Sequence, residues 1–292
     1  MGNIFSNNKK KSHSRREIKK MEKEPLKYFF PNFVKDTDIM VIFHFLECYL
    51  FQNLFSSPIE NSLLNECKVL DVGCGPGTWL LDLAATYSSA RFFGIDLFPI
   101  FPKEIKPSNV EFRQGDVLNT LPYDDNTFDY VHQANMLSVF TIEEWFLVIQ
   151  ELIRVCKPGG YIEFSEPELA VKTGPVLSRF YDALVTLSDS RNVKIRISNE
   201  IIKILVSLST VRNVDYKIST VTLGAKKGGN AGQAYMDIHD GYFLNDPMPE
   251  TLCKFMGTTK EGYLKLFKEA KKEVNETFAP NCEIYRIWCQ KI

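Results

Sequence analysis

The chain has 292 residues, of which 45% are hydrophobic and 24% are charged, and its formal net charge at pH 7 is −1. This length and hydrophobic content suffice for one sizeable buried core, so we expect a single folded domain with elaborations. The sequence has no apolar run near the roughly 18 residues that a membrane-spanning helix needs and no signal-peptide pattern, which excludes both classes and predicts a cytoplasmic protein.

The charges are distributed unevenly along the chain. Residues 1–23 contain eight lysines and arginines and two glutamates, a local charge of +6, which leaves −7 for the rest. We therefore predict a disordered basic tail over residues 1–24 and a folded domain over residues 25–292. Nucleic-acid binding is not expected, because it would require a basic face on the folded domain.

The tail begins with a lipidation pattern. Gly2 follows Met1, and Ser6 completes the N-myristoylation motif. One acyl chain binds membranes only weakly, but neighbouring basic residues add attraction to an anionic leaflet. The pattern predicts lipidation of Gly2 and peripheral contact with the cytosolic face of a membrane. A solvated tail and a nuclear localisation segment are the alternatives.

The first predicted helix follows the tail. Residues 36–38 supply capping side chains, and apolar residues then recur at helical spacing through Leu50. We expect this segment to cover the pocket that the following elements form.

The most informative run begins with an apolar strand that ends at Asp71 and leads through Gly73, Gly75 and Gly77 into an amphipathic helix. Glycine lacks Cβ, so such a turn lets the backbone approach a nucleoside-bearing cofactor at the helix N-terminus. The dinucleotide fingerprint Gly-x-Gly-x-x-Gly would require a glycine at Thr78, and the carboxylate of Asp71 would repel a pyrophosphate. A carboxylate there attracts a cationic amine, which predicts S-adenosylmethionine.

Two further predicted strands lead to acids. Residues 91–96 end at Asp96, nineteen residues after the last glycine of the turn, near the spacing at which an acid binds ribose hydroxyls. Residues 110–114 are followed by Asp116, whose position suits an adenine amino group. Because the carboxyl ends of parallel strands share one crevice, the three acids predict a single cofactor site.

More motifs follow between residues 68 and 168. Residues 128–132 and 157–163, together with the glycine turn, resemble the fourth strand, the turn into the fifth strand and the cofactor loop of class I S-adenosylmethionine-dependent methyltransferases. The resemblance implies an α/β fold with a Rossmann-like, doubly wound, mostly parallel seven-stranded sheet, an N-terminal helical cap and an inserted helical region. It places the cofactor-binding core at residues 65–168 and the substrate-side helical elements at residues 25–60 and 170–280.

Three features are typical of a fungal group of these enzymes that includes regulators of secondary metabolism. They are Trp79 after the glycine loop, the run Asp96–Ile100, and Tyr28–Asn32 upstream of the first helix. The chain departs from the group at Ile39 and Phe43, which replace an arginine and a glutamine of that helix.

The resemblance also implies how the cofactor is held. The first acid and the glycine turn would hold its methionine end, the second acid its ribose and the third its adenine, while residues at the end of the fourth strand would line the sulfonium and acceptor side. The implied cofactor-binding residues are Asp71, Gly73, Cys74, Gly75, Pro76, Gly77, Asp96, Leu97, Asp116, Val117, His132 and Gln133.

No catalytic group is assigned, because methyl transfer from a sulfonium depends mainly on the alignment of donor and acceptor. If the acceptor must lose a proton, His132 is a candidate base, and a buried structural histidine is the alternative. His44 and Glu166 are further candidates by the same argument. Trp79 is expected to pack rather than to contact a cation.

The remaining elements are less regular. Residues 141–144 form a capping box for a helix that residues 157–160 end. The glycine-rich residues 224–232 are expected to form a mobile connection beside the substrate entrance. Further helices are predicted at residues 175–189, 198–208, 233–244 and 260–275, and further strands at residues 216–223 and 284–289.

The seven cysteines show neither Cys-x-x-Cys spacing nor a cluster with histidine, so we expect reduced thiols and no metal site. The sequence predicts a methyltransferase that acts on a small-molecule or lipid-like acceptor. The alternatives are a protein methyltransferase in a regulatory complex and a non-catalytic, cofactor-binding regulatory or scaffold protein.

Overall fold

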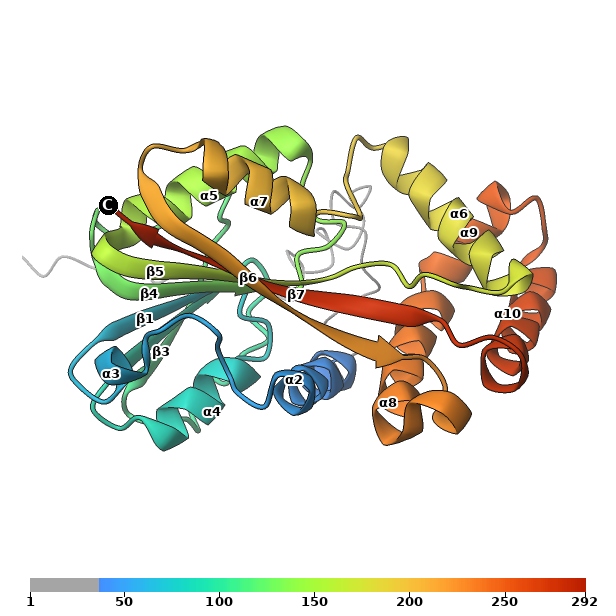
Figure 1. Ribbon diagram of the computed structural model, residues 1–292, viewed down its shortest axis with the longest axis horizontal. Coiled ribbons are helices and arrows are strands. Elements are labelled where there is room, and N and C mark those ends of the chain that lie inside the picture. Colours follow the sequence, from blue (N-terminus) through green and yellow to red (C-terminus); the bar gives the residue numbers. More distant parts are fainter. Residues whose placement is uncertain (1–36) are drawn as a thin grey trace, which may run out of the picture.

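The computed structural model describes residues 37–292 (Figure 1). The basic tail, its Gly2 and the run Tyr28–Asn32 lie outside the described residues. Within residues 37–292, no helix is both long enough and apolar enough to cross a membrane.

One seven-stranded sheet runs through the described part of the chain, in the order β3-β2-β1-β4-β5-β7-β6. The neighbouring pairs from β3 to β5 are parallel, whereas β7 is antiparallel to both β5 and β6. The predicted Rossmann-like, mostly parallel sheet is confirmed. Its strands are β1 (Lys68–Val72), β2 (Arg91–Asp96), β3 (Val110–Gln114), β4 (Phe128–Ala134), β5 (Cys156–Pro167), β6 (Val211–Thr222) and β7 (Asn281–Lys291).

The strand order reverses between β1 and β4, which pair with Asp71 opposite His132 and Val72 opposite Gln133. In doubly wound sheets, ligands bind beyond the carboxyl ends of the strands at this reversal. The topology therefore places a crevice at the glycine turn that follows β1.

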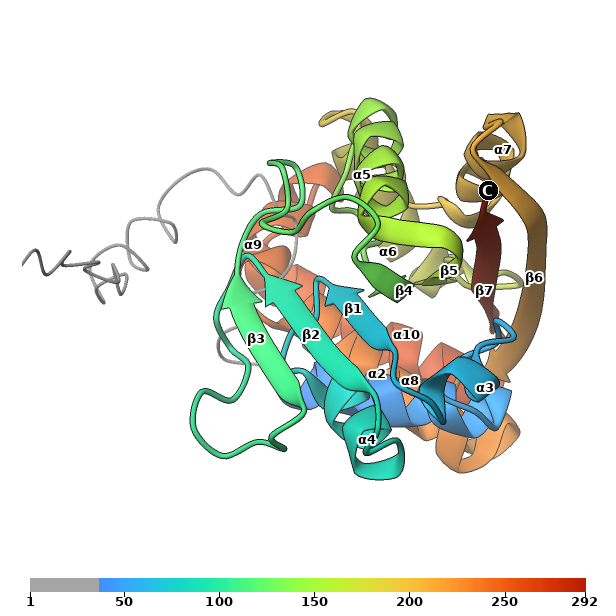
Figure 2. The same cartoon turned by 90° about the vertical axis from the view of Figure 1, so that its left-hand side faces the viewer.

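Helices cover both faces of the sheet and form a separate group at one end (Figures 1 and 2). Helices α5 and α7 lie on one face and α3 and α4 on the other, while α6, α8, α9 and α10 gather beyond the end of the sheet. The helices are α2 (Thr37–Phe51), α3 (Glu60–Leu63), α4 (Thr78–Thr86), α5 (Ile142–Val155), α6 (Pro175–Asp189), α7 (Ser198–Ser207), α8 (Ala225–Leu244), α9 (Met248–Phe255) and α10 (Lys260–Glu276).

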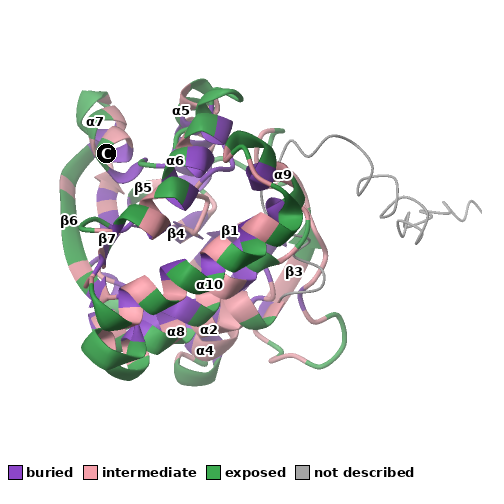
Figure 3. Cartoon of the chain, turned by 90° about the vertical axis from the view of Figure 1, so that its right-hand side faces the viewer, coloured by how far each residue is buried: buried purple, intermediate pink, exposed green. Residues whose placement is uncertain are grey.

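The helices beyond the sheet have their own apolar core around Phe180 of α6. The ring of Phe180 is fully buried, and its centroid lies 5.9 Å from that of Phe243, 5.0 Å from that of Tyr263 and 5.3 Å from that of Phe267. Buried and exposed residues alternate along α8 and α10, as expected for helices with one face on a core (Figure 3). These helices form a second wall opposite the carboxyl ends of the strands, where the topology places the crevice.

The prediction of a mobile connection over residues 224–232 was wrong, because α8 already begins at Ala225. The helix is interrupted only at Gly229, where the backbone is not helical. A Cβ at Gly228 would lie 1.8 Å from the carbonyl oxygen of Thr222, and one at Gly232 would lie 2.4 Å from the same oxygen. These glycines allow close packing of α8 on the end of β6 rather than mobility.

Other predicted elements agree with the structure. The capping box of α5 is present, with Glu144 N donating to Thr141 Oγ1 at 3.2 Å and Thr141 N donating to Glu144 Oε2 at 3.0 Å. Helices α6, α7 and α10 and strand β7 confirm the predictions made for their segments. Residues 157–160, however, belong to β5, strand β6 begins earlier than predicted, and α9 was not predicted. All seven cysteines are free thiols.

Replacement of Phe180 by alanine should lower the free energy of unfolding by about 3–5 kcal/mol, because it removes a fully buried ring and leaves a cavity. Phe146→Ala on α5 is the control, since Phe146 is 44% exposed and should change stability by less than about 1 kcal/mol. Denaturant unfolding curves measure both values, and equal effects would contradict the described core.

Candidate functional site

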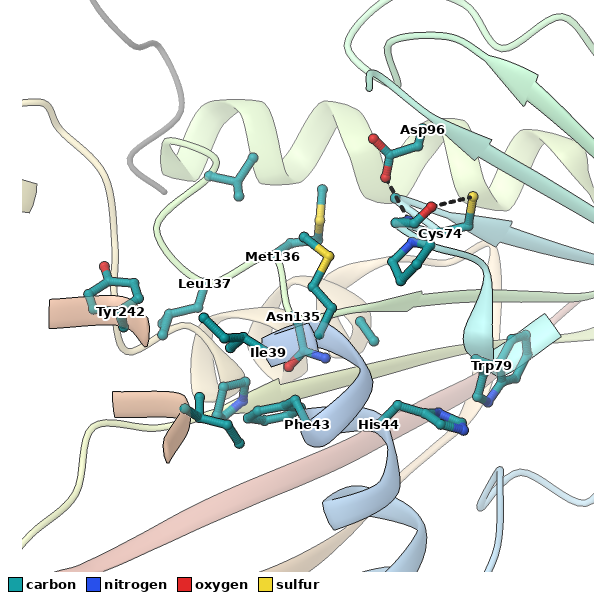
Figure 4. A pocket seen from close by; sticks show the side chains of 18 of the residues that line it. Ile39, Phe43, His44, Cys74, Trp79, Asp96, Asn135, Met136, Leu137 and Tyr242 are labelled. Carbon is teal, nitrogen blue, oxygen red and sulfur yellow. Dashed lines mark hydrogen bonds between the residues drawn. The ribbon is translucent and has the colours of Figure 1, made fainter. Parts of the chain in front are cut away.

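A cavity of about 310 Å³ lies at the carboxyl ends of β1 to β4 and extends to α2, α6 and α8 (Figure 4). Asp71, Asp96 and Asp116 all line it, so the acids at the ends of three parallel strands lie around one cavity, as the topology requires. Gly77 and Gln133 do not line it. The predicted cofactor residues that line the cavity are Asp71, Gly73, Cys74, Gly75, Pro76, Asp96, Leu97, Asp116, Val117 and His132.

The glycine turn forms one wall of the cavity. Gly73, Gly75 and Gly77 adopt φ values of +76°, +53° and +78°, which other residues rarely reach. A Cβ at Gly73 would lie 3.0 Å from Met136 Sδ, so bare backbone keeps this part of the cavity open. A Cβ at Gly77 would lie 2.4 Å from Cζ of Phe112, and Gly77 thus serves the packing against β3 rather than the cavity.

Asp96 links the glycine turn to the end of β2. Its carboxylate accepts hydrogen bonds from Gly75 N and Phe98 N, each at 2.8 Å. Burial raises the pKa of Asp96 to about 6, against the effect of these two hydrogen bonds. One strand along, Asp116 accepts a hydrogen bond from Leu118 N at 3.0 Å and lines the same cavity. Both carboxylates retain lone pairs that can accept from hydroxyl or amino groups of a ligand.

Asp71 and His132 form a buried pair across β1 and β4. The ring of His132 donates from Nδ1 to Asp71 Oδ1 at 2.8 Å, and both residues are at most 4% exposed. Trp79 stacks on one face of the His132 ring, and the two ring centroids lie 3.9 Å apart. Trp79 Nε1 in turn donates to the carbonyl oxygen of Leu54 at 2.8 Å. His132 is therefore held rigidly at the edge of the cavity, and Trp79 packs as expected.

The prediction that Gln133 lines the sulfonium side is contradicted by its position. His132 and Ala134 line the cavity, whereas Gln133 between them does not, because alternate residues of β4 point to opposite faces of the sheet. Gln133 is fully buried, and its amide has no hydrogen-bond partner among residues 37–292.

Helix α2 covers the cavity, as the sequence predicted for this segment. His44 Nε2 donates to Asp82 Oδ2 of α4 at 2.7 Å and thereby ties α2 to the core. Glu47 was not predicted; it is buried and accepts a hydrogen bond from Ser165 Oγ. Burial raises the pKa of Glu47. The lining residues of α2 are Ile39, Met40, Phe43, His44 and Glu47.

Glu166 does not line the cavity and supports it from behind. Its Oε1 accepts a hydrogen bond from Met136 N at 2.9 Å, which fixes the segment after β4. Burial raises the pKa of Glu166 well above its ordinary value. This placement assigns Glu166 a structural role rather than that of a base.

Asn135 is a further lining residue that the sequence did not reveal. It follows β4 with φ of +58°, and its backbone N donates to Ser165 O at 2.9 Å. Its Oδ1 is buried and has no hydrogen-bond partner among the described residues. Figure 4 shows Asn135 among the side chains that line the cavity, with Met136 and Leu137 of the same segment. Its position directly after a strand end, where asparagine tolerates positive φ, was the available signal.

Comparisons with known proteins agree with this geometry. A family described as "Methyltransferase domain" matches residues 69–160. The chain is 30% identical over 145 residues to the secondary metabolism regulator LAE1 of Cochliobolus heterostrophus, which covers 49% of this chain and 46% of that protein. It is 34% identical over 121 residues to the N-methyltransferase verN of Clonostachys rogersoniana, covering 40% and 42%.

Residues 69–160 of the chain carry a methyltransferase domain. The crystal structure of YcgJ protein from Bacillus subtilis shares the fold, with a TM-score of 0.50, 18% identity, and coverage of 78% of this chain and 93% of that chain. The alignments span less than half the length of the two relatives named above. The resemblance to fungal secondary-metabolism regulators is thus confirmed at the level of this domain.

The residues present fit S-adenosylmethionine, the cofactor that the sequence predicts for this methyltransferase domain. The wall at Gly73 and Gly75 is a cradle that a Cβ would narrow, and the acids at the strand ends suit a ligand with cationic groups and no phosphate. Asp96 and Asp116, which the sequence predicts to bind the ribose and the adenine, both line this cavity. Within residues 37–292, no group of three His, Cys, Asp or Glu side chains is placed to hold a metal ion.

Cofactor affinity should fall as the pH is lowered through the pKa of Asp96. Ribose hydroxyls donate to the ionised carboxylate, so binding favours the charged form and is strongest above a pKa of about 6. We expect roughly tenfold weaker binding of S-adenosylmethionine at about pH 5 than at about pH 7.5. Calorimetry should also show a flatter pH dependence for Asp96→Asn. An equally steep profile in this variant would assign the titration to another group.

Gly75→Val should abolish S-adenosylmethionine binding in calorimetry, because the side chain would enter the cavity at a position with φ of +53°. Gly159→Val is a matched control: its φ is +79°, but an added Cβ would meet nothing within 4 Å and lies away from the cavity. It should keep the wild-type affinity. If both variants bind equally well, the glycine turn is not the cofactor cradle.

Proposed function

We propose that this chain is an active methyltransferase that transfers a methyl group from S-adenosylmethionine to a small, mainly apolar acceptor. The observation that carries the proposal is the continuity of the cavity, which runs from the cofactor residues into a chamber between α2, α6 and α8. We call this part the aromatic chamber. It is lined by Phe43, Leu137, Leu169, Ala170, Tyr181, Leu184, Tyr235, Ile238, His239, Tyr242 and Phe243.

The chain's own residues align the reactants. Bound S-adenosylmethionine supplies a methyl group on a positively charged sulfonium, which leaves as a neutral thioether. Asp96 and the Gly73–Gly75 backbone fix the donor side, and the aromatic chamber fixes the acceptor by apolar contact. Such alignment contributes on the order of 7–11 kcal/mol to barrier reduction in favourable systems. The Asp71–His132 pair and Asn135 hold the region between the two parts in one conformation.

The burial of the chamber favours a small molecule over a protein side chain as the acceptor. Tyr181, Tyr235 and Phe243 are at most 6% exposed, so their rings meet a ligand inside the molecule rather than on its surface. A protein methyltransferase or a non-catalytic scaffold gains no support from the described residues. Peripheral membrane contact through the tail stays a prediction from the sequence.

An assay of S-adenosylhomocysteine release should therefore respond to small molecules. We expect release from S-adenosylmethionine with fractionated lipid or soluble metabolite extracts of a fungal culture, and none with a protein pool. Gly75→Val, which should not bind the cofactor, serves as the inactive reference. Release with the protein pool alone, or no release with any fraction while the cofactor binds, would contradict the proposal.

A further inference from the structure

The aromatic chamber offers no positive charge to a ligand. Among residues 37–292, no lysine or arginine lines the cavity. Apart from Asp71, Asp96 and Asp116, two carboxylates line the cavity, and both already accept hydrogen bonds within the protein. Glu47 accepts from Ser165 Oγ, and Glu168 Oε1 accepts from Ser198 N at 3.1 Å. Burial of an anionic group without a cationic partner is strongly unfavourable, so phosphate and carboxylate compounds are poor ligands here.

The chamber does contain one polar pair, Tyr181 of α6 and His239 of α8. Tyr181 Oη lies 2.6 Å from His239 Nε2, and His239 Nδ1 lies 3.0 Å from the carbonyl oxygen of Tyr235. A carbonyl can only accept, so Nδ1 carries the proton and Nε2 accepts from the tyrosine hydroxyl. The hydrogen bonds thus determine both the tautomer of the histidine and the direction of the tyrosine proton.

This pair is polar but uncharged. Both side chains are at most 8% exposed. Burial lowers the pKa of His239 and raises the pKa of Tyr181 well above its ordinary value, so both stay neutral near pH 7. Because the hydroxyl of Tyr181 donates its proton to His239, its oxygen keeps lone-pair capacity for a donor from a ligand.

We propose that the acceptor is an uncharged, mainly aromatic compound with a hydroxyl group, and that Tyr181 and His239 are the specificity-determining residues that hold this hydroxyl in the aromatic chamber. The inference rests on the proposed function, because it names the substrate class of the same site. The surrounding rings contribute apolar contact and π-stacking, and the polar pair orients the molecule within them.

Three probes that share one ring system test the proposal on the full-length protein loaded with S-adenosylhomocysteine. These are 2-naphthol, 2-methoxynaphthalene, which cannot donate a hydrogen bond, and 2-naphthoate, which is anionic. We expect 2-naphthol to bind about tenfold more tightly than the ether, as for one buried hydrogen bond, and 2-naphthoate to show no saturable binding. No binding of 2-naphthol, or equal binding of 2-naphthoate, would overturn the proposal.

A double variant, Tyr181→Phe with His239→Phe, separates recognition from structure. It removes both polar groups and keeps aromatic volume, so it should bind both uncharged probes with similar affinity while its affinity for the ether stays at the wild-type value. If the two residues had only a structural role, the double variant would bind both uncharged probes more weakly, and by the same factor. Tyr263→Phe is the control, because Tyr263 donates to Phe243 O at 2.8 Å behind the chamber and does not line it. It should keep the tenfold preference, and loss of that preference in the control would refute the assignment.

Binding of S-adenosylhomocysteine to the same wild-type preparation distinguishes a wrong acceptor class from a failure of the proposed function. If the wild-type protein binds it and the probes rank differently from the expected order, only the acceptor class is wrong. If the wild-type protein fails to bind it, the proposed function fails first.

Discussion

The hydrogen bond from Gly75 N to Asp96 is the interaction on which the site depends. It joins the turn after β1 to the end of β2 at 2.8 Å, and it exists only because Gly75 can adopt a φ of +53°. The same carboxylate is bound by Phe98 N, so one buried side chain orders the loops that follow two strands. Burial raises the pKa of Asp96, so the ionised carboxylate is disfavoured in the protein alone. Hydrogen bonds from a bound ligand would stabilise the ionised form at this position.

A second constraint is the close approach of α2 and α8. A Cβ at Gly241 of α8 would lie 1.8 Å from Cδ1 of Ile39, so the absence of a side chain lets α2 rest directly on α8. At its other side α2 is tied to α4 through His44 and Asp82. One helix therefore spans both parts of the cavity, and a displacement of α2 would alter the cofactor wall and the acceptor wall together.

The sequence allowed the sheet and the cofactor half to be predicted because their determinants are local. Asp71 and Asp96 lie at the ends of apolar strands, and Asp116 follows a strand in which apolar and polar residues alternate. Parallel topology then brings the three acids together without any knowledge of side-chain packing. Gln133 was misplaced because the boundary of β4 decides which residues face the cavity, and a shift by one residue inverts the assignment. Asn135 was missed for the same reason.

The acceptor half could not be predicted, because its residues acquire meaning only through contacts between distant segments. Tyr181 and His239 are 58 positions apart and meet across α6 and α8. The glycines near the start of α8 suggested mobility, yet they permit tight packing against Thr222. Neither helix carries a local motif for ligand binding, and the periodic apolar residues that predict a helix do not say which of them will face a cavity.

The two halves of the cavity differ in charge, and this difference follows from their different origins in the fold. The cofactor half is built from strand ends that carry Asp71, Asp96 and Asp116, whereas α6 and α8 contribute aromatic rings and one neutral polar pair. A cationic donor is therefore favoured on one side, and an uncharged acceptor on the other. Since the cavity has no lysine or arginine from residues 37–292, a sulfonium bound there would meet no lysine or arginine charge from the described wall. The charges that line each half of the cavity therefore distinguish the two reactants independently of individual hydrogen bonds.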